Sequence, residues 1–398
     1  MREVVIASYL RTAQSRSRPS APDRDWFHRL RADELLARLL PEVISRAGVS
    51  AEEIDDFLVG SAMGVSEQWT FGGRTPVFLA NLPESVPAKF IDQQCGSGMA
   101  AMQTAFLEIT TGFADIALVA GMEHMTRVPM GPTLFENGTI VMNPDLSSGE
   151  KYAHWDMSTS LNMGLTAEKL ARISGIDRDR MDRWAQRSHR LAQQALEDGF
   201  FDGEILPVTA PQADGSVRVV RHDQSIRKEV SLKRLGELKP VFTADGVITP
   251  GNASPLNAGA SAMLLMDQDA SQTSGVTPLG RIVSIGFAGV DPTIMGAGPV
   301  PAVRKALEKA GLEARDIDYW EINEAFSVVT LHCIDALNID PERVNVMGGA
   351  IAIGHALGAT GIRLAGTLTR ILKKRGGRLG CACACIGGGQ GVATIIEI

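Results

Sequence analysis

Cys95 lies between a segment typical of a β-strand and one typical of a helix, in the stretch DQQCGSGMAAMQT (92–104). The positive end of a helix dipole and its unpaired N–H groups favour a thiolate. Gly96 and Gly98 leave room for a substrate carbonyl to reach both the sulfur and a backbone N–H. Cys95 is therefore a candidate nucleophile, although a buried packing role explains a free cysteine about equally well.

A nucleophilic thiol needs a base, and His355 is the candidate. It lies in GGAIAIGHALGATG (348–361), a loop of glycine and small apolar residues with almost no other reactive side chain, which favours function over packing. Asn323 and Glu324 follow a strand-like pattern in EINEAFS (321–327). An asparagine there suits holding a water or a carbonyl oxygen, and a helix N-cap role explains it equally well.

Three cysteines alternate in CACACIGGGQG (381–391). On a strand, Cys381, Cys383 and Cys385 share one face at spacings of about 6.6–7 Å. Sulfurs that bind one zinc lie within about 4 Å of each other, so we predict no metal site and interpret Cys381 and Cys383 as small strand residues. Cys385 borders a glycine-rich turn, where a reactive group can meet a substrate. The turn leads into a strand, unlike a nucleotide-binding GxGxxG loop.

The composition is that of an ordinary globular protein, with 398 residues of which 44% are hydrophobic and 21% charged. This length predicts two or three domains. A net charge of −7 gives no reason to expect binding to nucleic acid, and no apolar run is long enough to predict a membrane span. Five cysteines, an odd and sparse set without a secretion signal, indicate free thiols and a cytoplasmic location.

Strand-like and helix-like patterns alternate at both ends of the chain, which predicts an α/β fold with helices covering a parallel or mixed sheet. Near the N-terminus, strand patterns occupy 2–8, 54–62, 88–92 and 114–121, and helix patterns occupy 32–47 and the segment after Cys95. Near the C-terminus, strand patterns occupy 280–290, 316–323 and 378–398, and helix patterns occupy 299–312, 324–337 and the segment after His355. Each end contains a strand, a glycine-rich loop with one reactive side chain, and a helix, so we predict a duplicated unit.

The segment between these ends, roughly 125–250, has a different character. Residues 165–240 hold 14 of the 39 Lys and Arg but 12 of the 46 Asp and Glu, so this part is locally basic in an acidic protein. A basic insertion suits a ligand with phosphates. Solvated helix faces with i,i+4 ion pairs are the better explanation for most of these arginines.

Taken together, the motifs resemble the thiolase family across essentially the whole chain. The motifs that carry this resemblance are CGSG (95–98), GMEHMTRVPMG (121–131), MGLTAEKLA (163–171), GNAS (251–254), DPTIMGAGPVPA (291–302), NEAF (323–326), GGAIAIGHALGATG (348–361) and CIGGGQG (385–391). Within the motif at 121–131, the sequences EHM and RVPMG resemble those of degradative 3-ketoacyl-CoA thiolases more than those of biosynthetic acetoacetyl-CoA thiolases.

The resemblance implies an α/β fold, a five-layered αβαβα sandwich of two similar halves plus an inserted loop domain. The N-terminal half would comprise 1–124 and 257–278, the loop domain 125–256, and the C-terminal half 279–398. It also implies a homodimer or homotetramer, and in some family members a partner subunit from fatty-acid oxidation.

The implied reaction is thiolysis of a 3-ketoacyl-CoA by CoA, without a metal or organic cofactor, through an acyl group on Cys95. His355 would activate that thiol, and Cys385 would protonate the departing acetyl-CoA enolate. One oxyanion site would use His355 with a water held by Asn323, and the other the N–H groups of Cys95 and Gly387. The residues implied to bind CoA and the acyl group are Arg227 near the adenine, Phe242 and Ser254 along the pantetheine, and Met163 and Met295 at the acyl end.

Several positions depart from the family pattern. Ala356 replaces the proline of GHP, which predicts a freer loop at His355. The other departures are Ala258 for an aspartate, Asn162 for a histidine or methionine, and Gln93 with Gln94 before the nucleophile. They leave the Cys–His–Cys–Asn set intact and leave the acyl group open, so branched, aromatic or dicarboxylic substrates remain alternatives.

Three other functions also remain open. One is a decarboxylating condensing enzyme of the ketoacyl synthase type, and one is a weakly catalytic acyl-CoA-binding subunit. The third is a biosynthetic acetoacetyl-CoA thiolase.

Overall fold

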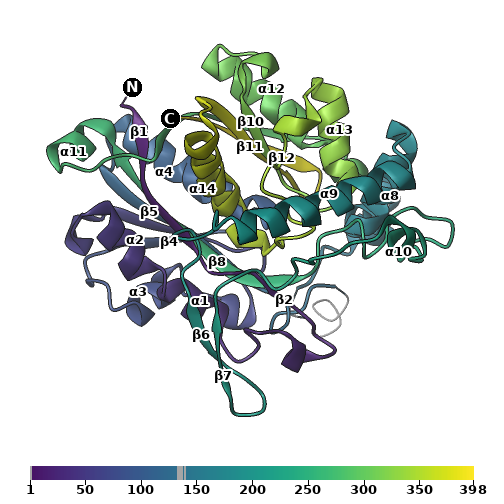
Figure 1. Cartoon of the computed structure of the whole chain (residues 1–398), viewed down its shortest axis with the longest axis horizontal. Coiled ribbons are helices and arrows are strands. Elements are labelled where there is room, and N and C mark those ends of the chain that lie inside the picture. Colours follow the sequence, from purple (N-terminus) through teal and green to yellow (C-terminus); the bar gives the residue numbers. More distant parts are fainter. Residues whose placement is uncertain (1, 132–137, 139) are drawn as a thin grey trace.

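The structure, a computed structural model, describes residues 2–131, 138 and 140–398. A ten-stranded sheet forms its centre, in the order β10-β11-β12-β9-β1-β8-β5-β3-β4, with β2 paired to β8 (Figure 1). The strands are β1 (Val4–Arg11), β2 (Ser15–Arg16), β3 (Asp56–Gly60), β4 (Ala88–Ile91), β5 (Ile116–His124), β8 (Asn257–Asp267), β9 (Gly280–Gly289), β10 (Tyr319–Ile322), β11 (Leu379–Ile386) and β12 (Gln390–Glu397). A separate hairpin consists of β6 (Val208–Pro211) and β7 (Val217–Val220).

The sheet consists of two halves with one topology. In the first half, β1 pairs antiparallel with β8, β8 antiparallel with β5, and β5 parallel with β3. In the second half, β9 pairs antiparallel with β12, β12 antiparallel with β11, and β11 parallel with β10. The halves join where β1 and β9 pair antiparallel, with Val4 opposite Ile282 and Ile6 opposite Gly280. The predicted duplication is therefore confirmed in the strand order.

Two helices fill the space between the half-sheets. They are α4 (Ser97–Thr111) and α14 (Leu357–Arg375), which pack against each other. Helix α4 contacts β3 and β5, and α14 contacts β5 and β8 of the first half as well as β10 and β11 of the second. Figure 1 shows α14 at the centre of the molecule, with the first half on one side and the second half on the other.

The outer faces of the two half-sheets are also covered by helices. On the first half these are α1 (Ala32–Ala37), α2 (Leu40–Ala47) and α3 (Arg74–Leu79), and on the second half α12 (Pro299–Ala310) and α13 (Ser327–Leu337). With the central helices and the two half-sheets, they make the five layers that the resemblance implied.

The predicted insertion contributes α6 (Asp145–Ser148), α7 (Met157–Ser160), α8 (Met163–Ser174), α9 (Arg178–Glu197), the β6–β7 hairpin and α10 (Leu232–Gly236). Residues 132–137 and 139 of this insertion lie outside the described residues. Helix α9 contacts α13 of the second half and α10 of the insertion. A further helix, α11 (Gln268–Thr273), follows β8. Within the described ranges, no helix is long and apolar enough to cross a membrane.

Two predicted helices differ from the observed ones. The pattern at 32–47 forms two helices, α1 and α2, because Pro41 lies in the first turn of α2, where its missing N–H ends the preceding helix. The pattern at 324–337 becomes helical only from Ser327, and the N-cap position is Phe326. Asn323 is therefore not a helix cap, which removes one of its two explanations.

Small residues let the two central helices start side by side. A Cβ atom on Gly98, in the first turn of α4, would lie 2.6 Å from the carbonyl oxygen of Gly358 in the first turn of α14. A Cβ on Gly361 would lie 2.6 Å from the backbone nitrogen of Met99. Such distances allow only glycine, so backbone packs on backbone here. Cys95 and His355, which directly precede these helices, are thereby brought to the same end of the central layer.

Candidate active site

The Cys95 turn packs directly on the second half of the molecule. Cys95 lies in the short 3-10 turn Gln94–Gly96 that leads into α4, and Gln94 adopts a positive φ of 49°. This left-handed conformation is uncommon for a residue other than glycine and turns the chain sharply before the thiol. A Cβ on Gly96 would overlap the side chain of Ile386 at the end of β11. The turn therefore rests on the strand that carries Cys385.

Cys95 is a thiol in the resting protein. Burial raises its pKa to about 11, although the backbone N–H groups of Gly387 and of Cys95 itself lower it, and the Glu123 carboxylate raises it further. Loss of solvation therefore opposes the thiolate that we expected the helix N-terminus to favour. The thiol needs a base.

The hydrogen bonds of His355 determine its tautomer. Its Nδ1 lies 2.7 Å from the Thr360 hydroxyl, and that hydroxyl donates to the carbonyl oxygen of Ala356 at 2.8 Å. A hydroxyl has one proton to donate, so it accepts from His355 Nδ1–H. Burial and the nearby Arg363 guanidinium lower the pKa of His355 to about 3. His355 is therefore neutral at pH 7, with its lone pair on Nε2.

Asn323 directs its side chain at this lone pair. Its Nδ2 lies 3.3 Å from His355 Nε2, and its backbone N–H donates to the carbonyl oxygen of Cys383 at 2.9 Å. The buried Oδ1 of Asn323 makes no hydrogen bond to any group in the described part of the chain. Its neighbour Glu324 instead accepts bonds from Trp184 and Ser188 of α9. Glu324 thus connects this segment to α9, while the Asn323 side chain contacts His355.

Cys385 approaches Cys95 from β11. Burial raises the pKa of Cys385 well above its ordinary value, and the charge of a Cys95 thiolate raises it further, which requires the two sulfurs to be near each other. The other two cysteines of β11, Cys381 and Cys383, are fully buried in an apolar cluster with residues of α12 and α13. Among the described residues, no group of three or more His, Cys, Asp and Glu side chains is arranged to hold a metal ion.

The predicted substrate-binding residues fall into two groups. Met163 lies at the reactive centre, because a Cβ on Gly387 would be 3.6 Å from its sulfur. Phe242 packs edge-on against Phe326, with ring centroids 6.3 Å apart, and Met295 is buried in the same cluster as Cys385. Ser254 lies next to Phe326, since its N–H donates to the carbonyl oxygen of the preceding residue, Ala325, at 3.0 Å. Arg227 belongs to the second group and lines a separate, narrow cavity.

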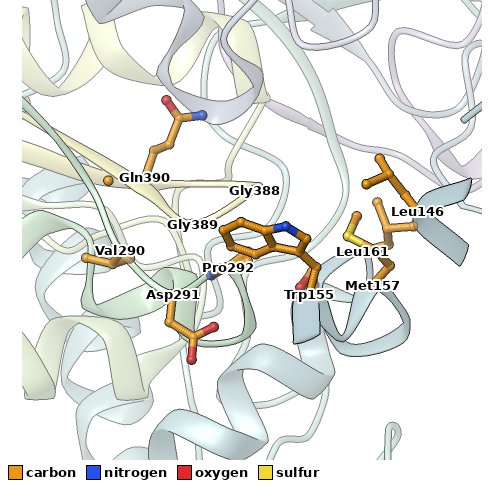
Figure 2. Close-up of a pocket in the computed structure, with 12 residues that line it drawn as sticks. Leu146, Trp155, Met157, Leu161, Val290, Asp291, Pro292, Gly388, Gly389 and Gln390 are labelled. Carbon is orange, nitrogen blue, oxygen red and sulfur yellow. The ribbon is translucent and has the colours of Figure 1, made fainter. Parts of the chain in front are cut away.

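A cavity of about 700 Å³ lies beside this centre. It is lined by Leu146, Trp155, Met157, Ser160, Leu161, Gly289, Val290, Asp291, Pro292, Gly388, Gly389 and Gln390. In Figure 2, the Trp155 indole extends between the Gly389–Pro292 side and the Met157–Leu161 side. Gln390 also connects the cavity wall to the nucleophile turn, because Gln93 Nε2 donates to its Oε1 at 3.1 Å. This cavity could not be predicted from the sequence, because its walls come from segments far apart in the chain.

The residues that hold the His355 loop were also not among the predicted ones. Asn257 Oδ1 accepts the His355 N–H at 2.8 Å, and Gln14 Oε1 accepts the Ala356 N–H at 3.0 Å. A proline at 356 has no N–H for the second bond. The expectation of a freer loop is therefore wrong, because hydrogen bonds hold it. Of the residues that position His355, only Thr360 could have been noticed in the sequence, because it is the one hydroxyl residue in the His355 motif.

Two further departures lie within the regular elements of the fold. Asn162 caps α8, since its Oδ1 accepts the N–H groups of Gly164 at 3.1 Å and Leu165 at 3.2 Å. Ala258 is fully buried in β8, paired with Ser15 and His124, and lines neither cavity.

Comparisons with known proteins identify the class of protein to which this fold and thiol pair belong. The family models described as "Thiolase, N-terminal domain" and "Thiolase, C-terminal domain" match residues 4–269 and 276–398. The chain therefore belongs to the thiolase family, a family of acyltransferase enzymes.

Individual relatives match over their full length. The chain is 42% identical over 402 residues to a 3-ketoacyl-CoA thiolase of Cronobacter sakazakii, covering 100% of both chains. It is 39% identical over 401 residues to a 3-ketoacyl-CoA thiolase of Marinobacter nauticus, covering 100% of this chain and 98% of that protein. Among solved structures, the Bacillus anthracis acetyl-CoA acetyltransferase has a TM-score of 0.87 at 34% identity, and human mitochondrial 3-ketoacyl-CoA thiolase 0.87 at 33%. Each match covers 100% of this chain and 99% of the solved one.

Proposed function

We propose that this protein is a 3-ketoacyl-CoA thiolase, which uses CoA to cleave a 3-ketoacyl-CoA into acetyl-CoA and a shortened acyl-CoA. The proposal is carried by two neighbouring thiols, Cys95 and Cys385, and the neutral His355–Asn323 pair, with Cys95 and His355 at the starts of the packed helices α4 and α14. The full-length similarity to curated 3-ketoacyl-CoA thiolases supports it.

In the proposed first step, Cys95 attacks C3 of the substrate and gives its proton to His355 Nε2. Burial raises the pKa of the thiol and lowers that of the imidazole, so the neutral pair is the resting state. The proton therefore moves as the carbon–sulfur bond forms. The N–H groups of Cys95 and Gly387, which already lower the pKa of the thiol, are suited to stabilise the oxyanion on C3.

In the proposed second step, the C2–C3 bond breaks and its electron pair moves onto acetyl-CoA as an enolate. The enolate oxygen would be stabilised by His355 and a water on Asn323 Oδ1, which has no partner within the described residues. Cys385 is the proposed acid for C2, because its raised pKa keeps it protonated until the carbanion forms. The thiol of CoA then gives its proton to the Cys385 thiolate and attacks the acyl group, and Cys95 leaves as a thiolate that takes its proton back from His355. These two thiols and the imidazole carry every proton, with CoA as substrate and product.

We propose that the 700 Å³ cavity takes the acyl chain. Most of its side chains are apolar, including Trp155, Met157 and Leu161, and Leu161 lies two residues before Met163 at the reactive centre. A medium straight chain suits such a lining, whereas an acetyl group would leave it unused. A terminal carboxylate would meet Asp291 at the cavity wall, so this position disfavours dicarboxylic substrates.

The test is CoA-dependent thiolysis of acetoacetyl, medium straight-chain, branched, aryl and dicarboxylic 3-ketoacyl-CoAs, followed by loss of the magnesium-enolate absorbance. We expect the medium straight-chain substrate to have the highest kcat/KM, at least about tenfold above acetoacetyl-CoA, since each buried methylene contributes about 0.8 kcal/mol. Highest activity on acetoacetyl-CoA would favour the biosynthetic alternative. No activity from folded protein on any substrate would contradict the proposed function.

We also propose that the insertion at 125–256 binds CoA and that the protein is a cytoplasmic homo-oligomer. All five cysteines are free thiols, which supports a reducing compartment. Strand β4 is the last strand of the sheet, and the nearby segment exposes large apolar side chains at Trp69, Phe71, Phe78 and Leu79. An edge strand with exposed apolar neighbours suits pairing with a second copy. Analytical ultracentrifugation tests this, and a monomer at micromolar concentration would contradict it.

A further inference from the structure

A fully buried ionic cluster joins the insertion to the end of β1. Arg11, the last residue of β1, donates from Nε to Glu204 Oε1 at 2.5 Å, and from Nη1 and Nη2 to the two carboxylate oxygens of Asp223 at 2.7 and 3.0 Å. The side chains of Arg11 and Glu204 are 0% exposed, and Asp223 is 1% exposed. Buried charges are stable only when such partners neutralise them. Glu204 precedes the β6–β7 hairpin and Asp223 follows it, so the cluster holds both ends of this segment to the first half of the molecule.

Asp223 also fixes the chain that follows β1. Its Oδ1, which accepts the hydrogen bond from Arg11 Nη1, accepts the backbone N–H of Gln14 at 2.7 Å as well. The carbonyl oxygen of Gln14 in turn accepts the N–H of Gln224, the residue after Asp223, at 2.9 Å. Gln14 is buried, with an exposed fraction of 2%. The insertion therefore binds both polar groups of the Gln14 backbone.

The same segment holds the His355 loop. The side-chain Oε1 of Gln14 accepts the Ala356 N–H at 3.0 Å, a bond that a proline at this position could not make. The carbonyl oxygen of Ser15 accepts a hydrogen bond from Asn257 Nδ2 at 2.8 Å, and Asn257 Oδ1 accepts the His355 N–H at 2.8 Å. Two consecutive N–H groups of the loop are thus bound by this segment, one directly and one through Asn257.

The contact between the segment and the loop is close. Gly354 has a φ of 123°, and a Cβ atom there would lie 2.7 Å from both Gln14 Oε1 and Asn257 Nδ2. Such distances leave no room for a side chain, so the loop backbone packs directly on these two amide groups. Asp223 itself lines neither of the two cavities. An effect of Asp223 on the reaction would therefore pass through the contact between Gln14 and the loop.

We propose that Asp223 is a positioning residue for His355, because it holds the Gln14 segment to which the His355 loop is bound. The proposal rests on the proposed function, in which His355 Nε2 takes the proton of Cys95. Proton transfer requires the donor and the acceptor to be within hydrogen-bond reach, so a displaced imidazole is a poorer base. The insertion thus takes part in placing the base, in addition to the proposed binding of CoA.

Two substitutions of Asp223 test this role. Asp223→Asn keeps an oxygen that accepts the Gln14 N–H, whereas Asp223→Ala has none, and both remove the carboxylate that pairs with Arg11. Both should lower the thermal unfolding midpoint, because the buried Arg11 charge loses a partner. In thiolysis, we expect kcat to fall about tenfold in Asp223→Ala and no more than about threefold in Asp223→Asn, with KM within about twofold of wild type. Equal kcat values in the two variants would show a purely structural role and overturn the proposal.

A substitution at Gln14 tests the same path with the ionic cluster intact, in case the Asp223 variants do not fold. Gln14→Met removes the Oε1 acceptor and should lower kcat about tenfold. Asp33→Asn is the matched control, since it breaks a pair between a buried aspartate and Arg31 at the start of α1, with bonds of 2.9 and 2.7 Å, outside the segment that holds His355. It should lower the unfolding midpoint and leave kcat within about twofold of wild type. Wild-type kcat in folded Gln14→Met would contradict the proposal.

Alkylation of Cys95 by iodoacetamide tests the position of the base without turnover. Cys95 is partly exposed and the other four cysteines are fully buried, so the reagent should add to Cys95 first, seen as a mass increase of the intact protein. The thiol must give up its proton to react, so we expect the rate to fall about tenfold in Asp223→Ala and no more than about threefold in Asp223→Asn. Equal rates for wild type and Asp223→Ala would rule out the positioning role. If Asp223→Ala reacted more slowly but wild type cleaved no 3-ketoacyl-CoA, the positioning role would stand and the proposed function would fail.

Discussion

At the start of its central helix, the first half of the molecule carries a thiol, whereas the second half carries an imidazole. The surrounding strand order is the same in both halves. The Cys95 turn is held by packing, since Gly96 lies directly on Ile386. The His355 loop is instead held by hydrogen bonds from its backbone to Asn257 and Gln14. The proposed nucleophile needs room to form a covalent bond, whereas the proposed base needs a fixed lone pair, and the two modes of support suit these two roles.

The equivalent strands β5 and β11 differ in the same way. At the end of β11, Cys385 faces the reactive centre. At the end of β5, Glu123 is buried and accepts the N–H groups of Ala62 at 2.9 Å and Gly358 at 3.1 Å. The carboxylate thus joins the first half to the first turn of α14. One copy of the repeated unit carries the proposed proton carrier at the position where the other carries a buried, hydrogen-bonded carboxyl group.

The largest effect is expected from the thiol of the first half. Cys95→Ala should lower kcat by at least about 10⁴-fold, because no other group can form the acyl intermediate. Its thermal unfolding midpoint should stay close to that of wild type. Retained thiolysis in the folded variant would contradict the assignment of Cys95 as the nucleophile.

A labelling experiment should distinguish the role of the second thiol, Cys385, from that of Cys95. Cys385→Ala should lower carbon–carbon cleavage about 10³-fold, as for loss of a general acid. Its Cys95 should still take an acyl group from a saturated acyl-CoA, seen as a mass increase of the intact protein. Cleavage near the wild-type rate would show that another group carries the proton. Failure of wild-type Cys95 to be acylated would favour a weakly catalytic binding subunit.

Glu123 should give the protein a pH-dependent stability. Burial raises its pKa to about 7, above that of an unfolded chain, although its hydrogen bonds lower it. The folded state therefore holds this proton more tightly, so the contribution is complete below about pH 4.5 and is lost as the pH rises through about 7. Relative to Glu123→Gln, wild type should lose about 3 kcal/mol of unfolding free energy over this range. Parallel curves from urea unfolding at several pH values would contradict this.

Thr360 should act through His355 without touching the substrate. Thr360→Val removes the acceptor of the Nδ1–H, so the imidazole no longer has a fixed tautomer, and kcat should fall about 30-fold, roughly 2 kcal/mol, with KM unchanged. Thr360→Ser keeps the hydroxyl and should restore most of the rate. Equal losses in both variants would indicate a packing role for Thr360 instead.

The smallest effect is expected at Ala356, which stands where the family pattern has a proline. Ala356 has a φ of −72°, which a proline ring accepts, but Ala356→Pro removes the N–H that Gln14 accepts. We expect it to lower the unfolding free energy by about 1 kcal/mol. In a Gln14→Met background, the same proline should cost nothing. An equal loss in both backgrounds would mean that the ring strains the loop by itself.

The candidate residues could be selected from the sequence because each lies in a short motif with few other reactive side chains. The alternation of strands and helices also predicted the duplicated fold. The burial of Cys95 could not be predicted in this way. Its position before a helix suggested a thiolate, but the surroundings of the thiol include Ile386 and Gly387, about 290 residues further along the chain. The same is true of Gln14 and Asn257, whose contacts with the His355 loop depend on strand register.

The order of strands in the sheet has a consequence for the protein during its synthesis. Strand β8, Asn257–Asp267, lies between β1 and β5, which are both made long before it. A nascent chain thus holds two strands with a gap between them until the whole insertion has left the ribosome. Cys385 follows more than a hundred residues later, in the last strand but one. A half-made chain therefore carries the proposed nucleophile without the proposed proton carrier and cannot complete the proposed reaction.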